Sequence, residues 1–175
     1  MIAQKTPLAD AVLITLELRK DHRGFFARAW CDKEADKHGL NKVWVQANIA
    51  GTTGRGTIRG MHYQVAPHEE IKLIRCVKGE IYDVIVDLRP GSSTFKKTWG
   101  VGLKADAFQM VYVPEGFAHG YQTLTDDVEV FYLVSQFYAP EAERGFRWDD
   151  PAFEISWPIQ EALTISEKDR NWPLF

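Results

Sequence analysis

The sequence predicts an all-β fold, and three observations lead to this prediction. Most segments read as short runs of β-branched and aromatic residues, separated by turn residues at a spacing of roughly 8 to 12 positions, which is typical of sandwiches and barrels. The chain is rich in aromatic residues, with six Trp, six Tyr and ten Phe, a composition that suits pleated, half-buried surfaces. Only one stretch, 31–39, reads clearly as a helix, with Asp32 as its N-cap and Gly39 just past its end.

The expected strands follow one another along the chain. A strand is expected within 11–18, and another at 42–50 precedes a Gly/Thr-rich loop at 51–57. The strongest local signal is 71–88, where Lys-Gly separates two apolar runs and predicts a β-hairpin. Further strands are expected at 98–103, 108–113, 120–125 and 128–138. From residue 140 onward the chain is polar and Pro-rich, so an irregular C-terminal segment is expected, with a candidate capping box at Ser166 and Asp169.

Length and charge narrow the class of protein. We expect residues 1–175 to form one domain, because this length can bury a sizeable core. The net charge of −3 provides no basic field, so nucleic acid is not an expected partner. Residues 1–15 lack the pattern of a signal peptide, and no apolar run approaches the ~18 residues of a membrane span. Two distant cysteines, Cys31 and Cys76, lack CxxC spacing, so reduced thiols in a cytoplasmic protein without membrane contact are expected.

Two histidine motifs point to the inside of a barrel. The stretch "VPEGFAH" (113–119) has the form P-x-G-x-x-H, in which a tight turn delivers His119 between strands. The stretch "IRGMHYQ" (58–64) places Arg59 and His62 within a strand-like run. Together they resemble the two-motif pattern of the cupins. This resemblance implies a cupin, or jelly-roll, β-barrel with one short helix and an irregular C-terminal segment.

The first motif lacks the metal ligands of metal-binding cupins. Those proteins carry two histidines two positions apart, whereas this sequence reads His62-Tyr63-Gln64. A catalytic transition-metal site needs about three protein ligands. His62 and His119 alone fall short, so no metal site is expected.

Five motifs resemble the dTDP-4-dehydrorhamnose 3,5-epimerase family of nucleoside-diphospho-4-keto-6-deoxysugar epimerases. They are "DHRGFF", "IRGMHYQ", "IKLIRCVKGEIYDVIVDLR", "PEGFAHGYQTL" and "SQFYAPEAERGFRWDDP", and they occur in order between about residues 10 and 170. The resemblance implies inversion of C3, C5 or both of a nucleotide-linked 4-keto sugar. The ketone acidifies the hydrogens on these carbons, and reprotonation of the enolate from the opposite face inverts them. No cofactor is required.

The resemblance assigns four catalytic roles. His62 is the base, a role that suits the titration range of imidazole, and Asp169 pairs with it. Tyr132 is the acid, and Lys72 is the cation beside the C4 oxygen. Without the resemblance, each residue has an ordinary structural interpretation. His62 would be a core histidine and Asp169 a helix cap, while Tyr132 would be a packed aromatic and Lys72 a lysine that reaches water. Alternation places Lys72 on the same strand face as Ile74, where an unpaired charge would be costly.

The resemblance also implies a set of substrate contacts. Arg23 and Arg59 match residues that hold the phosphates, for which forked guanidinium donors are suited. Gln46 and Asn48 match amide side chains that line the nucleotide site, and Tyr138 matches the aromatic residue that stacks on the base. Further substrate contacts are matched by His119, Glu143 and Lys168. In the family the strand bearing Arg23 comes from a second subunit, which implies a homodimer with composite active sites.

One position departs from the family pattern. After "RGFF" the family usually continues with a glutamate two positions on, but Arg28 stands there. A carboxylate accepts a hydrogen bond from the ring N–H of thymine, whereas a guanidinium only donates. Two interpretations therefore stay open. In the first, the substrate carries CDP, or a nucleotide with another base, instead of dTDP. In the second, Arg28 faces phosphate or solvent.

Three functions compete at this stage. The first is an epimerase of a 4-keto-6-deoxysugar, with a mono-epimerase of a CDP- or GDP-linked sugar as its variant. The second is a keto-isomerase or other sugar-modifying cupin, against which His62 argues. The third is a non-catalytic cupin that binds nucleotide sugar.

Overall fold

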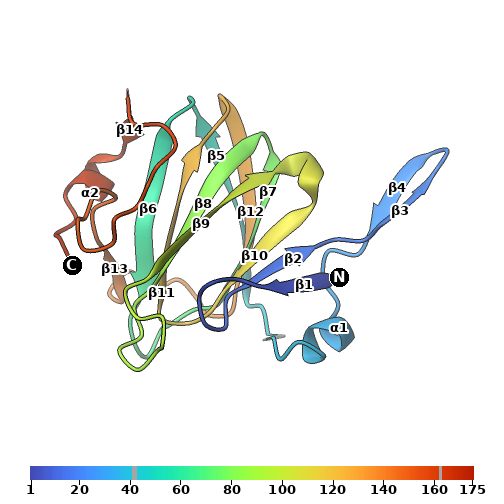
Figure 1. Cartoon of the computed structure of the whole chain (residues 1–175), viewed down its shortest axis with the longest axis horizontal. Helices are drawn as coiled ribbons and strands as arrows, with labels where there is room; N and C mark the ends of the chain where they lie inside the picture. Colours follow the sequence, from blue (N-terminus) through green and yellow to red (C-terminus); the bar gives the residue numbers. More distant parts are fainter. Residues whose placement is uncertain (41–42, 162) are drawn as a thin grey trace.

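Two antiparallel sheets face each other across the centre of the molecule (Figure 1). The computed structural model describes residues 1–40, 43–161 and 163–175. The first sheet has the order β1 (Ile2–Lys5), β2 (Val12–Thr15), β10 (Gln109–Val113), β7 (Lys72–Lys78), β12 (Asp127–Val134), β5 (Gln46–Thr53). The second has the order β13 (Glu143–Gly145), β6 (Thr57–Gln64), β11 (Phe117–Thr123), β8 (Glu80–Asp87), β9 (Thr98–Lys104), and β14 (Thr164–Ile165) runs parallel to β6. The all-β prediction is confirmed.

Apolar clusters lie between the two sheets and on part of the outer face of each sheet. Between the sheets lies a cluster that includes Ile74 of β7 and Ile85 of β8, both 1% exposed or less. On the outer face of the second sheet, the C-terminal segment contributes Phe146 and Trp157 to a second cluster. A third cluster packs the first sheet against α1 (Asp32–Asp36), which contributes the fully buried Ala35. Along β8 the successive residues 83–87 are all buried, so its side chains are covered on both faces of the sheet.

The predicted hairpin at 71–88 is wrong, although its two strands are present. β7 pairs with β10 and β12 in the first sheet, whereas β8 pairs with β11 and β9 in the second. Gly79 lies between them at φ +76°, and an added Cβ would approach the carbonyl oxygen of Asp127 to 2.5 Å. The turn therefore carries the chain from one sheet to the other. Apolar runs that are covered on both faces do not reveal which strands they pair with.

Element boundaries differ from the prediction in several places. The strand β11 begins at Phe117 and not at residue 120, and β12 ends at Val134 and not at residue 138. The helix α1 has Cys31, not Asp32, as its N-cap. The strand expected at 42–50 begins at Gln46, and Lys42 lies outside the described residues. The C-terminal segment contains a second short helix, α2 (Glu167–Arg170), so the expectation of one helix is wrong, and a 3₁₀ turn, η1, spans Ala105–Ala107.

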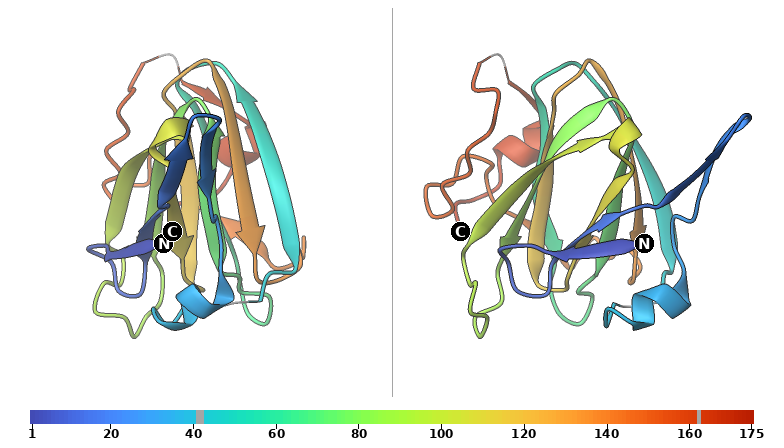
Figure 2. Two further views of the ribbon diagram at one scale, coloured as in Figure 1. Left: turned by 90° about the vertical axis from the view of Figure 1, so that its right-hand side faces the viewer. Right: turned by 45° about the vertical axis from the view of Figure 1, so that its right-hand side comes forward.

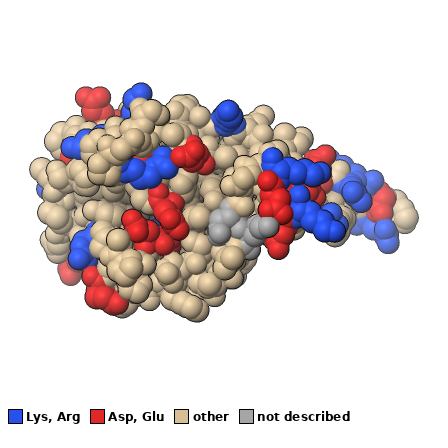
Figure 3. All heavy atoms as spheres, turned by 90° about the horizontal axis from the view of Figure 1, so that it is seen from below, with Lys and Arg blue, Asp and Glu red and all other residues tan. Residues whose placement is uncertain are grey.

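A two-stranded hairpin of β3 (Leu18–Asp21) and β4 (Gly24–Ala27) projects away from the sheets (Figure 2). Phe25 and Phe26 on β4 are 55% and 57% exposed. Lys and Arg side chains gather over this hairpin, with acidic side chains among them (Figure 3). The hairpin therefore combines bare aromatic surface with positive charge.

No helix of the described residues is long and apolar enough to cross the lipid bilayer.

Candidate active site

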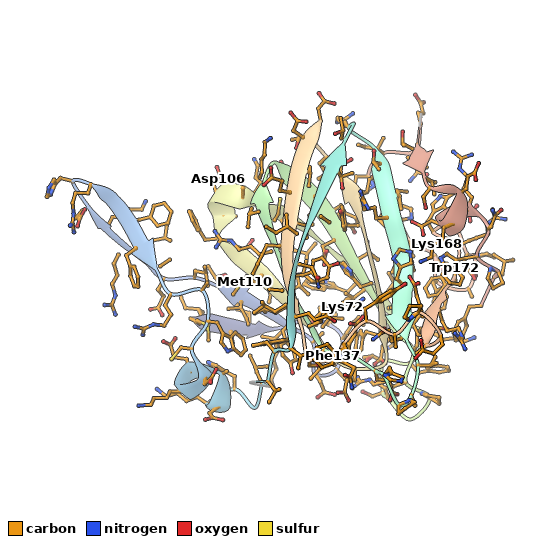
Figure 4. The ribbon with its side chains drawn as sticks, turned by 180° about the vertical axis from the view of Figure 1, so that it is seen from behind. Lys72, Asp106, Met110, Phe137, Lys168 and Trp172 are labelled. Atoms are coloured by element: carbon orange, nitrogen blue, oxygen red, sulfur yellow. The ribbon has the colours of Figure 1, made fainter. Side chains whose placement is uncertain are left out.

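A cavity of about 320 Å³ lies between the two sheets. Side chains from both sheets and from the C-terminal segment line it, so it is closed by parts of the chain that are distant in sequence. Figure 4 shows Lys72 in the interior, while Lys168 and Trp172 come from α2 and the residues after it. The polar side chains of the lining are Arg59, His62, Lys72, His119, Tyr121, Tyr132, Ser166, Lys168 and Asp169.

His62 and Asp169 form a hydrogen-bonded pair at one wall of the cavity. The strand β6 presents His62, and its Nε2 lies 2.6 Å from Oδ1 of Asp169. The other carboxylate oxygen accepts the N–H of Gly60 at 3.2 Å, and Asp169 is 3% exposed. Burial raises the pKa of Asp169, but the bonds from His62 and Gly60 outweigh it and leave the pKa below its ordinary value. Asp169 therefore remains an anion that fixes the imidazole ring.

The same residue also belongs to the helix α2. Ser166 is the N-cap of α2, and its hydroxyl accepts the N–H of Asp169 at 3.1 Å. This is one half of the expected capping box. The carboxylate of Asp169 does not return to the backbone of Ser166 but turns to β6. The cap thus holds the helix in the position from which Asp169 reaches His62.

Tyr132 reaches the same cavity from the opposite sheet. It lies on β12, where it pairs with Asn48 of β5 and Ile74 of β7. Desolvation raises the pKa of Tyr132, the charge of Glu70 raises it further, and Arg59 acts in the opposite direction. The phenol is therefore protonated at neutral pH and has a proton to donate.

Lys72 turns inward, as strand alternation predicts. It lies at the start of β7, on the same face as the buried residues Ile74 and Cys76. Its ammonium nitrogen lies 3.2 Å from Oε1 of Glu70, and the side chains are 11% and 13% exposed. The charge of Lys72 is thus paired, which lowers the cost of its burial.

A second cavity, of about 310 Å³, adjoins the first and shares His62, Lys72 and Tyr132 with it. Hydrogen bonds organise its outer wall. Glu143 accepts the hydroxyl of Tyr138 at 2.7 Å and the ammonium of Lys168 at 2.6 Å. The predicted contacts that line this cavity are Gln46, Asn48, Tyr138 and Glu143.

Two further cationic or titratable groups are held in place by the sheet. Arg59 donates from Nε to the hydroxyl of Thr52 at 2.9 Å and from Nη2 to the carbonyl of Gly51 at 3.0 Å. His119 on β11 lies beside His62 in the register of β6 and β11. Its Nε2 lies 2.7 Å from Oδ1 of Asp83, which is 1% exposed.

Two predicted contacts lie outside both cavities of their own chain. Arg23, at the tip of the projecting hairpin, donates to Asp21 at 2.6 Å and is largely exposed. Arg28 lies 3.6 Å from Glu34 at the base of the hairpin. The other predicted site residues line one or both cavities.

Sequence reasoning missed three residues that surround this site. Tyr121 is buried and bonds Thr52 at 2.9 Å, and desolvation raises the pKa of its phenol. Asp83 had a usable signal, because it interrupts the inward-facing series of Ile81 and Ile85 on β8 with a charge. Glu70 had none, since it stands beside the exposed Glu69 in a polar stretch.

The polar side chains of the two cavities surround a space large enough for an organic molecule. Among residues 1–40, 43–161 and 163–175, no group of three or more His, Cys, Asp or Glu side chains is arranged to hold a metal ion. A small barrel of two facing sheets, with a histidine–carboxylate pair opposite a phenol and a lysine, defines a cupin of the sugar-epimerase class.

Comparison with known proteins narrows this class to one family. The family profile described as dTDP-4-dehydrorhamnose 3,5-epimerase matches residues 5–175. The curated enzyme of that name from Shigella flexneri is 41% identical over 172 residues, covering 98% of this chain and 94% of its own. The chain belongs to the dTDP-4-dehydrorhamnose 3,5-epimerase family, and its enzyme class is that of the isomerases.

Solved structures of related enzymes share the fold of this chain. The Bacillus anthracis enzyme, with TDP and PPi bound, is 40% identical at a TM-score of 0.95, covering 99% of each chain. The Legionella pneumophila enzyme, in complex with dTDP-4-keto-L-rhamnose, is 32% identical at a TM-score of 0.93, covering 99% of this chain and 92% of its own. The cupin fold predicted from the two histidine motifs is thereby confirmed.

Proposed function

We propose that the protein inverts C3 and C5 of dTDP-4-dehydro-6-deoxyglucose in deoxysugar biosynthesis. One observation carries the proposal: a histidine and a tyrosine enter one cavity from opposite sheets. A flat enolate between them would face a base on one side and an acid on the other. This is what inversion at a carbon next to a ketone requires.

The chemistry needs only groups that line the cavity. His62 removes the proton from C3 or C5, and the C–H electron pair moves into the ring as the C4 oxygen becomes an enolate. Tyr132 then gives its proton to the opposite face of the same carbon, and the ketone re-forms. The enzyme is left with an imidazolium and a phenolate, which water returns to their starting states. Such general acid–base catalysis is worth about 10²–10⁴-fold.

Lys72 is proposed to stabilise the enolate. Its side chain lines the cavity together with His62 and Tyr132, and it is 11% exposed. A preorganised donor next to a developing oxyanion typically contributes about 3–4 kcal/mol to transition-state stabilisation. Removing Lys72 should therefore lower kcat much more than nucleotide binding.

The nucleotide is proposed to bind in the second cavity. Tyr138 is 57% exposed and offers a free ring face for stacking on the base. Gln46 and Asn48 line the same space and supply amide donors and acceptors. Arg59, His119 and Lys168 supply positive or N–H donors for the diphosphate and sugar. The dTDP ligands of the related structures favour thymidine over the cytidine alternative that Arg28 raised.

A homodimer is proposed to complete each site. Within one chain Arg23 lies far out on the projecting hairpin, where it pairs with Asp21 at 2.6 Å. The bare Phe25 and Phe26 beside it offer an apolar docking surface. Insertion of this hairpin into a second copy would bring Arg23 to the phosphates there. We further expect one domain that works in the cytoplasm, since Cys31 and Cys76 are free thiols.

The decisive experiment is proton exchange in D₂O, followed by NMR of the sugar protons. With dTDP-4-dehydro-6-deoxyglucose we expect the wild-type protein to replace both the C3 and the C5 hydrogens with deuterium. His62→Asn should abolish exchange at both carbons while leaving nucleotide affinity unchanged. Tyr132→Phe should still remove protons but lose inversion, because the base is intact and the acid is not.

Other outcomes separate the competing functions. Exchange at one carbon only would make the protein a mono-epimerase, and faster exchange with the CDP-linked sugar would restore the cytidine interpretation of Arg28. Tight binding without exchange at either carbon would leave a nucleotide-sugar-binding cupin and contradict the proposal.

A further inference from the structure

The loop that enters β7 turns a carboxylate into the active site, and none of the roles above uses it. Glu70 lines the second cavity together with Lys72 and Tyr132, and its side chain is only 13% exposed. Its neighbour Glu69 is exposed. Because residues two apart point to the same side of an extended segment, Glu70 and Lys72 share one face.

The backbone around Glu70 is tied down. The N–H of Ile71 donates to the hydroxyl of Ser135 at 2.8 Å, and the N–H of Ser135 donates to the carbonyl of Ile71 at 3.0 Å. This double link fixes the residue between Glu70 and Lys72 to the end of β12. The position of the carboxylate is therefore set by the same strand that carries Tyr132.

We propose that Glu70 is a positioning residue of the proposed epimerase, one that holds the ammonium of Lys72 in the cavity and faces the phenol of Tyr132. A lysine ammonium has three N–H donors. The ammonium forms an ion pair with Oε1 of Glu70 at 3.2 Å, and its N–H donors are proposed to bind the C4 oxygen of the substrate. The inference rests on the proposed function, because it assigns Lys72 and Tyr132 the roles given there.

The electrostatic setting of Tyr132 supports this role. Five bases line the two cavities around it, namely Arg59, His62, Lys72, His119 and Lys168, and a positively charged neighbour favours a phenolate. Glu70 acts in the opposite sense, since its charge raises the pKa of Tyr132 while that of Arg59 lowers it. The other titratable groups that line the two cavities with Tyr132 are Tyr63, Glu70, Tyr121, Tyr138, Glu143 and Asp169. Glu70 thus keeps the phenol of Tyr132 protonated while it holds the ammonium of Lys72 in place.

The test uses Glu70→Gln, which keeps the shape and removes the charge, with Glu69→Gln as the matched control outside the cavity. Tyr132 is followed directly by NMR of protein labelled with ¹³C at tyrosine Cζ, with its signal assigned from Tyr132→Phe. We expect the pKa of Tyr132 to fall by about 0.5–1 unit in Glu70→Gln and to stay at the wild-type value in Glu69→Gln. Glu70→Asp, which retains the charge, should restore most of the shift.

Kinetics provide the second measurement. In Glu70→Gln the basic limb of the pH profile of kcat/KM should move to lower pH by the same amount, because the phenol then loses its proton earlier. We expect kcat to fall about tenfold or more through misplacement of Lys72, with a smaller change in KM. If Glu70→Gln leaves both the Tyr132 titration and the basic limb where the wild-type protein has them, the inference is wrong. A wild-type protein that shows no exchange at C3 or C5 would refute the proposed function, and the Tyr132 titration would still decide whether Glu70 acts on the phenol.

Discussion

At the scale of single residues, Asp169 makes two hydrogen bonds to one strand. Oδ1 meets Nε2 of His62 at 2.6 Å, and Oδ2 accepts the N–H of Gly60 at 3.2 Å. Both partners lie on β6, so the carboxylate fixes the imidazole relative to the backbone that bears it. Gly60 has φ +128°, and an added Cβ would approach Cα of Gly120 to 2.5 Å. The close approach of β6 and β11 at this point therefore requires glycine.

The first residue-scale prediction concerns this pair. Asp169→Asn keeps the shape of the side chain but removes the charge that favours the imidazolium. We expect kcat to fall about 10²–10⁴-fold, while the dissociation constant for dTDP is unchanged. Steady-state kinetics and calorimetric titration with dTDP measure the two quantities. Glu167→Gln, an exposed carboxylate on the same helix, should leave both at wild-type values; a comparable loss of kcat in that control would trace the effect to the helix and not to the pair.

The resemblance anticipated the residues of this site better than the chemistry of single positions did. His62 lies inside a distinctive seven-residue motif, and Lys72 begins a strand whose alternation points it inward. Glu70 could not be predicted, because its inward turn depends on the tie between Ile71 and Ser135, which are 64 positions apart. Neither residue marks that contact in the sequence.

At the scale of elements, the connection from β8 to β9 is organised around one buried carboxylate. Oδ1 of Asp87 accepts the backbone N–H and the Nε of Arg89, both at 3.0 Å. Oδ2 accepts the hydroxyls of Ser92, at 2.5 Å, and Thr94, at 2.7 Å. Burial raises the pKa of Asp87, but these bonds prevail and hold the pKa far below its ordinary value.

We therefore expect Asp87→Asn to lower the free energy of unfolding by about 2–3 kcal/mol at pH 7. Because the folded-state pKa is depressed, the contribution of Asp87 is fully present above the unfolded value of about 3.9 and is lost as the pH falls below it. The difference between wild type and Asp87→Asn should thus stay constant down to about pH 5 and shrink toward pH 3. Urea unfolding at several pH values measures it.

A matched control is available in the same network. Asp10 is 72% exposed and pairs with the same arginine, Arg89, at 2.8 Å. Asp10→Asn should cost about 0.5 kcal/mol or less, as expected for an exposed ion pair. Equal costs for the two variants would mean that burial of Asp87 adds nothing.

Local patterns predicted most of the longer strands but not how they pair, and they did not predict β1 or the hairpin of β3 and β4. The runs within 71–88 are strands, as expected, yet they belong to different sheets. Local turn chemistry favours a hairpin, whereas the two-sided burial of both strands is a property of the assembled barrel. The helix α2 was anticipated only through its cap at Ser166, since four residues are too few to show a helical period.

At the scale of the whole molecule, the projecting hairpin makes the proposed dimer testable. If Arg23 serves the partner's cavity, a protomer with Arg23→Ala spoils only the neighbouring site, and one with His62→Asn spoils only its own. Co-expression of the two variants in equal amounts should then restore about a quarter of all sites, since half of the dimers are mixed and each mixed dimer has one complete site.

The measurement is epimerase activity of the co-expressed protein against the two parents, with sedimentation to establish the dimer. Activity no higher than the mean of the two parents, in a sample shown to be dimeric, would place Arg23 at its own chain's site or at none. If sedimentation shows that the co-expressed protein is monomeric, the proposed composite site is contradicted.

The separation of His62 and Asp169 by 107 positions has a consequence for how activity first appears. On the ribosome the strand that carries the imidazole is complete long before its carboxylate partner has been made. If His62 is the base, as proposed, a nascent chain without Asp169 lacks the carboxylate that orients it. We therefore expect no epimerase activity before Asp169 has been made and placed against β6.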